Sequence, residues 1–190
     1  RHGLCFLGRP GLEGFKAGRY DDAARLLAAA LENAEKTSFG ADAAYLRFKA
    51  LESLMSTAPT PELTESYVKA MREFLARYPS HASAAEARYR LGEYLQGQRD
   101  FAAAIEEYGR VEGDPALAVR AVFGSLQSEF ELLREARTKP EREALAERIG
   151  ADLTRFQEKA ALLEKQPSRG GVPLPEFEAT VLERDFAADV

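Results

Sequence analysis

Residues 85–115 read AEARYRLGEYLQGQRDFAAAIEEYGRVEGDP, and this stretch decides the fold. Apolar residues recur at three- and four-residue intervals in a helix that we expect from Ala82 to about Gln98, and again from Asp100 to Glu112. Pro115, with Gly113 and Asp114 before it, stops the second pattern. Because few residues separate the two patterns, we expect an antiparallel pair of helices.

The same alternation of helical pattern and breaker continues on both sides of this pair. Upstream, the breakers are Thr37–Gly40 and the prolines Pro59, Pro61 and Pro79. The remaining predicted helices cover 21–36, 41–56, 61–78, 116–137 and 140–165. The last two are longer than a usual repeat helix and predict a long C-terminal hairpin. Gln166–Pro175 carries two Gly and three Pro and predicts a linker before a last short helix.

Composition favours the all-α class. Ala, Leu, Glu and Arg dominate, Trp is absent and β-branched residues are sparse, as is typical of long packed helices. The formal charge of -5 is modest and both signs are interleaved, so no basic stripe is available for nucleic acid. No apolar run approaches the roughly 20 residues that cross a bilayer, so we expect no transmembrane segment.

Cys5 is the only cysteine, so no internal disulfide can form, and this count leaves the compartment open. The chain opens at Arg1 rather than Met and has no charged-then-apolar signal segment. We therefore expect an excised or processed piece from which a targeting signal has been removed.

Residues 85–115 match a known helical repeat pattern, and an upstream segment partly repeats the same pattern. Residues 85–115 resemble a tetratricopeptide repeat, whose pattern has an aromatic, Leu-Gly and an aromatic on the first helix, then Ala, an aromatic and a small residue on the second, with Pro at the end. The matching residues are Leu91, Gly92, Phe101, Ala104, Tyr108, Val111 and Pro115. Gly92 and Ala104 are expected to let two backbones approach while Phe101 and Tyr108 fill the space between hairpins. Gly18–Ala23 looks like the same turn and second helix.

The resemblance implies a tetratricopeptide-like solenoid of antiparallel helical hairpins with a longer C-terminal hairpin. Gly8, Pro10, Gly11 and Gly14 replace helix formers, so the first segment is expected to be irregular. The expected division is an irregular leader at 1–11, repeats at 12–115, the long hairpin at 116–165, a linker at 166–175 and a terminal helix or tail at 176–190.

Within this superfamily, Phe74–Pro79 followed by Ala84–Glu93 looks like the repeats of bacterial cell-envelope lipoproteins, of the cell-division coordinator and outer-membrane-protein assembly types. The similarity implies a periplasmic or cell-envelope setting, as a helper of a larger machine. A cytoplasmic setting is the alternative, because similar phrases occur in cytoplasmic repeat proteins.

Residue types with metal or catalytic chemistry are few. His2, His81 and Cys5 are the only imidazole and thiol groups, and no two of them share a predicted helix face, so we expect no metal site. Paired carboxylates such as Glu106 and Glu107 are interpreted as the solvated face of a helix. We therefore expect neither an enzyme nor a cofactor.

The concave groove of such a solenoid is the candidate site, because the first helix of each hairpin lines it. The expected partner-binding residues of residues 85–115 are Glu86, Tyr89, Arg90, Glu93 and Gln96. An aromatic flanked by charges suits a peptide or a partner helix, although ordinary surface residues would show the same spacing. The Lys and Asn residues of carboxylate-clamp repeats are missing, so capture of a chaperone's acidic C-terminus is not expected.

Two further alternatives stay open. The chain is expected to be a non-enzymatic scaffold or adaptor, and the alternative is a sensory or regulatory ligand-binding domain, which an internal cavity between hairpins would favour. The apolar seam of the last long helix contains Leu145, Ile149, Leu153 and Phe156. This seam either forms a homodimer interface or packs back onto the helix predicted at 116–137.

Overall fold

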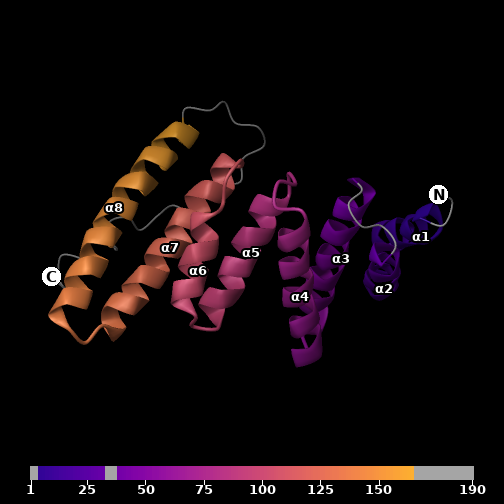
Figure 1. Ribbon diagram of the computed structural model, residues 1–190, viewed down its shortest axis with the longest axis horizontal. Coiled ribbons are helices and arrows are strands. Elements are labelled where there is room, and N and C mark those ends of the chain that lie inside the picture. The colour runs from indigo at the N-terminus through magenta and orange to yellow at the C-terminus, as the bar shows by residue number, and fades with distance from the viewer. Residues whose placement is uncertain (1–3, 33–37, 165–190) are drawn as a thin grey trace.

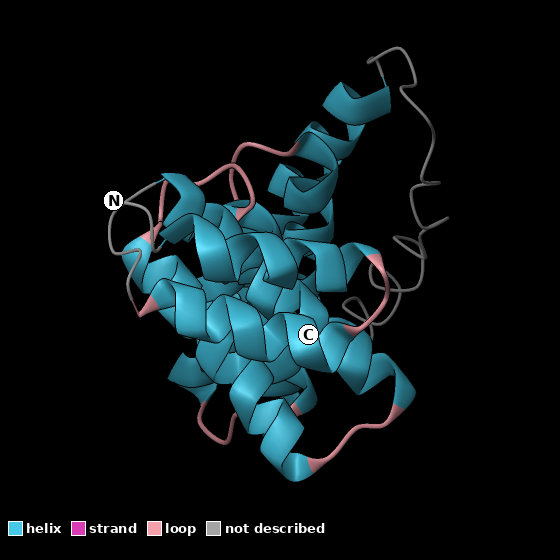
Figure 2. Cartoon of the chain, turned by 90° about the vertical axis from the view of Figure 1, so that its right-hand side faces the viewer, coloured by secondary structure: helices cyan, strands magenta, loops and turns pink. Residues whose placement is uncertain are grey.

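A computed structural model describes residues 4–32 and 38–164, and all the regular structure in these residues is helical (Figures 1 and 2). The prediction of an all-α protein is therefore confirmed. The helices are α1 (Leu4–Lys16), α2 (Tyr20–Leu31), α3 (Ser38–Thr57), α4 (Pro61–Arg77), α5 (Ala84–Gly97), α6 (Phe101–Gly109), α7 (Pro115–Glu135) and α8 (Lys139–Glu164).

The helices follow one another in a row along the long axis of the molecule (Figure 1). Each helix packs on the next in sequence, because the connections between helices are short. In addition α1 contacts α3 and α5 contacts α7, and side chains of α3 bond to those of α5, so odd-numbered helices form one side of the row. The contact between α4 and α5 is the thinnest between consecutive helices.

Local sequence explains where several helices begin. Thr60 precedes Pro61 and its side chain accepts a hydrogen bond from the backbone N–H of Leu63 at 3.2 Å. Asp114 does the same before Pro115, accepting from the N–H groups of Ala116 and Leu117. The connections before α2 and after α6 use glycine in the left-handed region, with φ of +72° at Gly18 and +88° at Gly113.

The expected irregular leader at 1–11 is wrong for the residues that the structure describes, because α1 begins at Leu4 and runs through Pro10. Pro10 is exposed, while Gly11 and Gly14 are buried where α1 meets α2. A methyl group at Gly11 would lie 2.8 Å from Cγ of Leu27. The glycines are therefore sites of close packing, and contact with α2 overrides their low helix propensity.

Tyr108 of α6 lies between two glycines on neighbouring helices. A methyl group at Gly92 of α5 would lie 2.6 Å from the Tyr108 ring, and one at Gly124 of α7 would lie 2.5 Å from it. The expected close approach at Gly92 is confirmed, but its neighbour is an aromatic ring rather than a second backbone. Gly11 and Leu27 are separated in sequence by the same number of residues as Gly92 and Tyr108, so the α1–α2 and α5–α6 pairs repeat one packing device.

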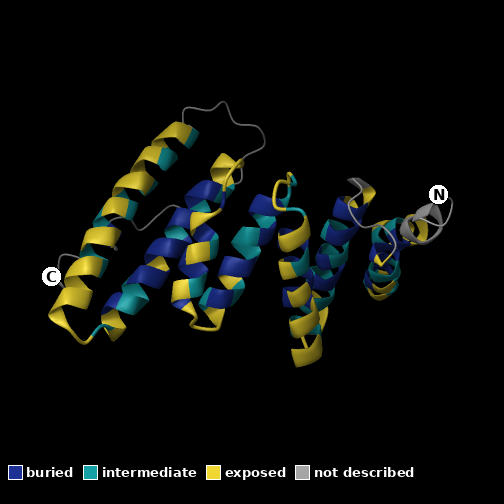
Figure 3. Ribbon diagram, viewed as in Figure 1, coloured by how far each residue is buried: buried dark blue, intermediate teal, exposed yellow. Residues whose placement is uncertain are grey.

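The apolar core runs along the row, as the buried residues of Figure 3 show. One cluster extends from Ala23 of α2 to Ala121 of α7. A separate, smaller cluster joins α7 to α8, with Val122, Leu126, Leu133 and Ile149 at its centre. Leu145, Leu153 and Phe156 pack against this cluster, so the apolar seam of the last long helix is used inside the chain.

The long helices predicted at 116–137 and 140–165 correspond to α7 and α8, which pack as a hairpin. The end of the helix predicted at 21–36, the linker at 166–175 and the terminal helix or tail at 176–190 lie outside the described residues. Within the described residues, no helix combines the length and the apolar character that crossing a bilayer requires.

Candidate partner-binding groove

A pocket opens between α5 and the start of α7, on the side of the row formed by the odd-numbered helices. It is lined by Glu86, Tyr89, Arg90, Asp114, Ala116, Leu117 and Arg120, and its volume is about 260 Å³. Three of its residues belong to the predicted partner-binding set. We call this pocket, together with the side chains of Tyr45, Lys49 and Glu52 of α3 beside it, the odd-helix groove.

Helical spacing brings the α5 residues of the groove to one side. Leu91, Gly92 and Leu95 are buried toward α6 and the core. Glu86, Tyr89 and Arg90 are half-buried and Glu93 is exposed, so they lie away from that buried face. The register that we expected from the Leu-Gly step is therefore correct for these positions.

Glu86 connects α5 to α3. Its two carboxylate oxygens accept hydrogen bonds from Tyr45 Oη at 2.9 Å and from Lys49 Nζ at 2.8 Å. Burial alone would raise the pKa of Glu86, but the hydrogen bonds from Lys49 and Tyr45 hold that pKa below its ordinary value. Lys49 also contacts Glu52, one turn along α3.

Arg90 makes a second bridge between the same two helices. Its Nε lies 3.1 Å from a carboxylate oxygen of Glu52 on α3, and its Nη1 donates to Glu93 at 2.8 Å. Arg90 was expected on the exposed side of α5, as a partner-binding residue. It is instead half-buried and paired, because α3 places an acidic side chain opposite it.

Tyr89 is half-buried at the wall of the pocket. Its ring centroid lies 5.9 Å from that of Tyr108. Burial raises the pKa of the Tyr89 hydroxyl to about 12, Glu93 adds to the rise, and the positive charges of Arg120 and Arg90 oppose it. Tyr89 is therefore a neutral aromatic group at any physiological pH.

Gln96 does not line the pocket. Its side-chain oxygen accepts a hydrogen bond from Tyr108 Oη at 2.7 Å, and its nitrogen donates to Gln127 of α7 at 3.3 Å. Gln96 therefore holds α5, α6 and α7 together. Glu93 contacts the groove through Arg90 without lining the pocket.

Further groove residues, which we did not predict from the sequence, come from the neighbouring helices. Leu117 and Arg120 come from α7 and Asp114 caps its start, while Tyr45, Lys49 and Glu52 come from α3. Each trio has helical spacing, which is the one signal that indicates a shared face. Which face meets α5 depends on how neighbouring hairpins pack.

In the described part of the chain, no group of three or more His, Cys, Asp and Glu side chains is placed to hold a metal ion. His81 lies in the turn before α5, where its Nδ1 accepts from the backbone of Ser83 and its Nε2 lies 3.3 Å from Asp42. His2 and the side chain of Cys5 lie outside the described residues.

A scan against protein-family models and a search of curated proteins found no match for the chain.

Proposed function

We propose that this chain is a non-enzymatic scaffold or adaptor that holds a partner peptide or helix in the odd-helix groove. In this proposal the row of hairpins is a tetratricopeptide-like solenoid, and α1, α3, α5 and α7 are the first helices of successive hairpins. The groove is then the concave face of the solenoid.

Three features support the tetratricopeptide-like assignment. Consecutive helices pack as hairpins, and α5 also contacts α7, the first helix of the next hairpin. Residues 85–115 carry the Leu-Gly step and the aromatic positions of the repeat. The Gly92–Tyr108 contact recurs as Gly11–Leu27 at the same sequence separation.

The pocket beside Tyr89 is the observation that carries the binding proposal. It combines a half-buried aromatic ring, the apolar side chain of Leu117 and the charged side chains Arg90 and Arg120 in one open depression. Peptide-binding surfaces combine such features, since an aromatic or Arg anchor in a pocket contributes a large share of binding energy.

The setting is part of the proposal. The likeness of Phe74–Pro79 and Ala84–Glu93 to envelope lipoprotein repeats supports a periplasmic or cell-envelope scaffold. A cytoplasmic scaffold would use the same groove in the same way.

The test replaces Tyr89 by Ala and compares proteins captured from lysate by wild type and variant. We expect the variant to lose its specific partner, with affinity reduced by about 2 kcal/mol or more, because Tyr89 is the aromatic anchor of the pocket. Quantitative affinity purification followed by titration of the recovered partner measures this loss.

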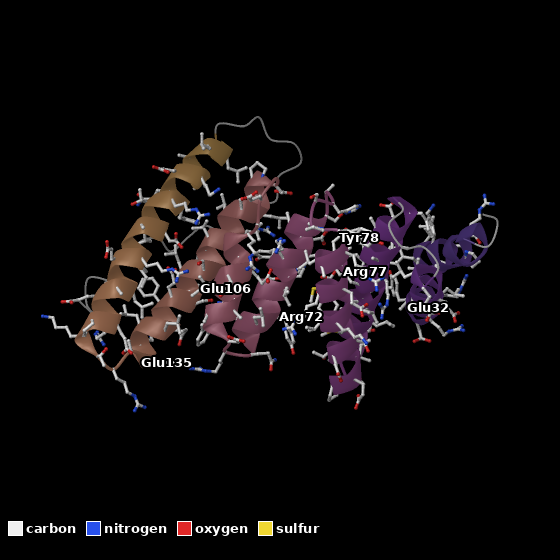
Figure 4. The ribbon with its side chains drawn as sticks, viewed as in Figure 1. Glu32, Arg72, Arg77, Tyr78, Glu106 and Glu135 are labelled. Atoms are coloured by element: carbon white, nitrogen blue, oxygen red, sulfur yellow. The ribbon has the colours of Figure 1, made fainter. Side chains whose placement is uncertain are left out.

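The matched control is Glu106→Gln on α6, one of the even-numbered helices (Figure 4). Glu106 is exposed there, whereas the neighbouring Glu107 pairs with Arg88 of α5 and is unsuitable. Loss of partners by the Glu106 variant with retention by the Tyr89 variant would place binding on the opposite side and contradict the proposal.

A further inference from the structure

The charges around the odd-helix groove are almost all neutralised within the chain. Glu86 is bonded to Lys49 and Tyr45, and Arg90 is paired with Glu52 and Glu93. The Asp114 carboxylate is directed at the start of α7, where it accepts two backbone hydrogen bonds. These groups have little capacity left for a partner's charges.

Arg120 differs from the other charged groups that line the pocket. In the part of the chain that the structure describes, its guanidinium makes no hydrogen bond or ion pair, although the side chain is half-buried. The side chain as a whole is half-buried, and neither Glu86 nor Asp114 of the same pocket pairs with it. The Arg120 guanidinium is therefore available to an external anion.

The surroundings of Arg120 define the size and character of that anion. Tyr89 and Leu117 supply apolar walls beside it, and the whole pocket holds about 260 Å³. Glu86 and Asp114 also line the pocket, so a doubly charged group would meet two acidic neighbours while gaining one cation. A single carboxylate next to an apolar group matches this arrangement.

We propose that Arg120 is a specificity residue that pairs with an Asp or Glu side chain inside the partner peptide, while an adjacent apolar side chain of that peptide packs against Tyr89 and Leu117. This inference rests on the proposed function of the groove and adds the chemistry of the partner. The acidic side chain would pair with Arg120, the charged side chain of the pocket that has no ion-pair partner among the described residues.

The experiment uses a phage-displayed library of random dodecapeptides selected against the whole chain. We expect the selected sequences to be enriched in an Asp or Glu next to an apolar residue. Synthetic versions of the strongest peptides are then titrated against wild type and Arg120→Gln by calorimetry. Each peptide is tested with its acidic residue present and with that residue changed to Asn or Gln.

The expected result is a double-mutant cycle with strong coupling. Arg120→Gln should lower the affinity for the acidic peptide by about tenfold or more, and removing the acidic residue from the peptide should lower it by a similar factor. The two changes together should lower the affinity little more than either change alone. Arg120→Lys should recover part of the affinity, because it keeps the charge without the planar fork.

Arg72→Gln is the matched control, since Arg72 of α4 is an exposed arginine on the other side of the row and its removal changes the net charge equally (Figure 4). Thermal unfolding of all variants verifies that each remains folded. Equal losses for Arg72→Gln and Arg120→Gln would indicate a general charge effect and overturn the inference.

The outcomes separate the inference from the function on which it rests. Peptides that bind Tyr89→Ala more weakly than wild type, but bind Arg120→Gln as tightly as wild type, would support the groove as the binding site. They would contradict the inference that Arg120 pairs with an acidic residue of the partner. Peptides insensitive to both variants, or a selection that yields none, would reject both. Peptides whose C-terminal amidation abolishes binding would assign Arg120 to a terminal carboxylate and contradict the internal acid.

Discussion

At the scale of single residues, the packing around Tyr108 sets how closely α5, α6 and α7 approach. The ring is almost fully buried, and Gly92 and Gly124 lie against its two sides. Its hydroxyl is held by Gln96 at 2.7 Å. The ring therefore has no direction in which to yield if either glycine gains a side chain.

Replacing Gly92 by Ala should lower the free energy of unfolding by about 1–3 kcal/mol, because the added methyl group overlaps the fixed Tyr108 ring and this cost exceeds the gain in helix propensity. Denaturant unfolding measures the change. Gly150→Ala in α8 is the control, since nothing lies within 4 Å of its new methyl group, and it should stabilise the protein. A stabilised Gly92 variant would show that the Tyr108 contact is wrong.

Glu129 of α7 is a second residue-scale feature, because its side chain is 0% exposed at the α7–α8 contact. Arg148 Nε lies 2.7 Å from Oε1, yet neither carboxylate oxygen has a well-oriented hydrogen-bond partner. Burial, followed by the negative charge of Asp152, raises the pKa of Glu129 to about 7, against the opposing charges of Arg148 and Arg155. The fold thus favours the protonated form.

A raised pKa in the folded state fixes the sign of the pH dependence. The contribution of Glu129 is fully present below the unfolded pKa, near 4.5, and is lost as pH rises through about 7. We expect unfolding free energy to fall by about 1–3 kcal/mol between these limits, and Glu129→Gln to remove most of this slope. Denaturation midpoints at several pH values test it, and an unchanged slope in the variant would assign the effect elsewhere.

At the scale of helices, α3 and α5 are joined by side chains rather than by backbone proximity. No Cα atom of α3 lies within 8 Å of one in α5, and the two helices meet through Tyr45, Lys49 and Glu52 on one side and Glu86 and Arg90 on the other. These α3–α5 hydrogen bonds and ion pairs lie at the junction where α4 and α5 have their thinnest contact. Their charges therefore hold neighbouring hairpins together.

Glu86→Gln should destabilise the protein by about 1 kcal/mol, because Lys49 loses one of its charged partners in a half-buried site. The loss should shrink at high salt, which screens the remaining pairs. Arg25→Gln removes an exposed pair with Asp22 and should cost close to nothing. Urea unfolding at low and high salt makes the comparison. Equal effects of the two variants would argue against a stabilising role for the α3–α5 ion pairs.

At the scale of the whole molecule, stability is distributed along the row and is lowest where the core is smallest. The main apolar cluster joins α2 through α7. Among the described helices, α8 packs only on α7, through a small cluster that encloses Glu129. Leu162 near the end of α8 is 63% exposed. In a row of nearest-neighbour contacts, an end helix with one partner opens first.

Hydrogen exchange should therefore show that amides of α8 open at a lower free energy than those of α5 and α6. The difference should grow as pH rises through about 7, once intrinsic exchange rates are corrected, because the charged form of Glu129 weakens the α7–α8 contact. Exchange followed by mass spectrometry measures it. Equal protection of α8 and α5 would mean that the row opens as one unit.

The sequence by itself determined the helices and much of their pairing, because apolar spacing, capping residues and Pro or Gly breakers act within a few residues of where they stand. Gly92 was recognisable as a close contact for the same reason. Glu86, Tyr89 and Arg90 could be placed on one side of α5, since a helix has a fixed period.

The tertiary structure alone decided what those side chains meet. The glycines of α1, which we expected to break a helix, lie inside it and pack against α2. The tertiary structure also paired Arg90 with α3, moved Gln96 to the α5–α6–α7 junction and brought Arg120 into the pocket. These outcomes depend on the angle and distance between hairpins, which many distant contacts set together and no local pattern records.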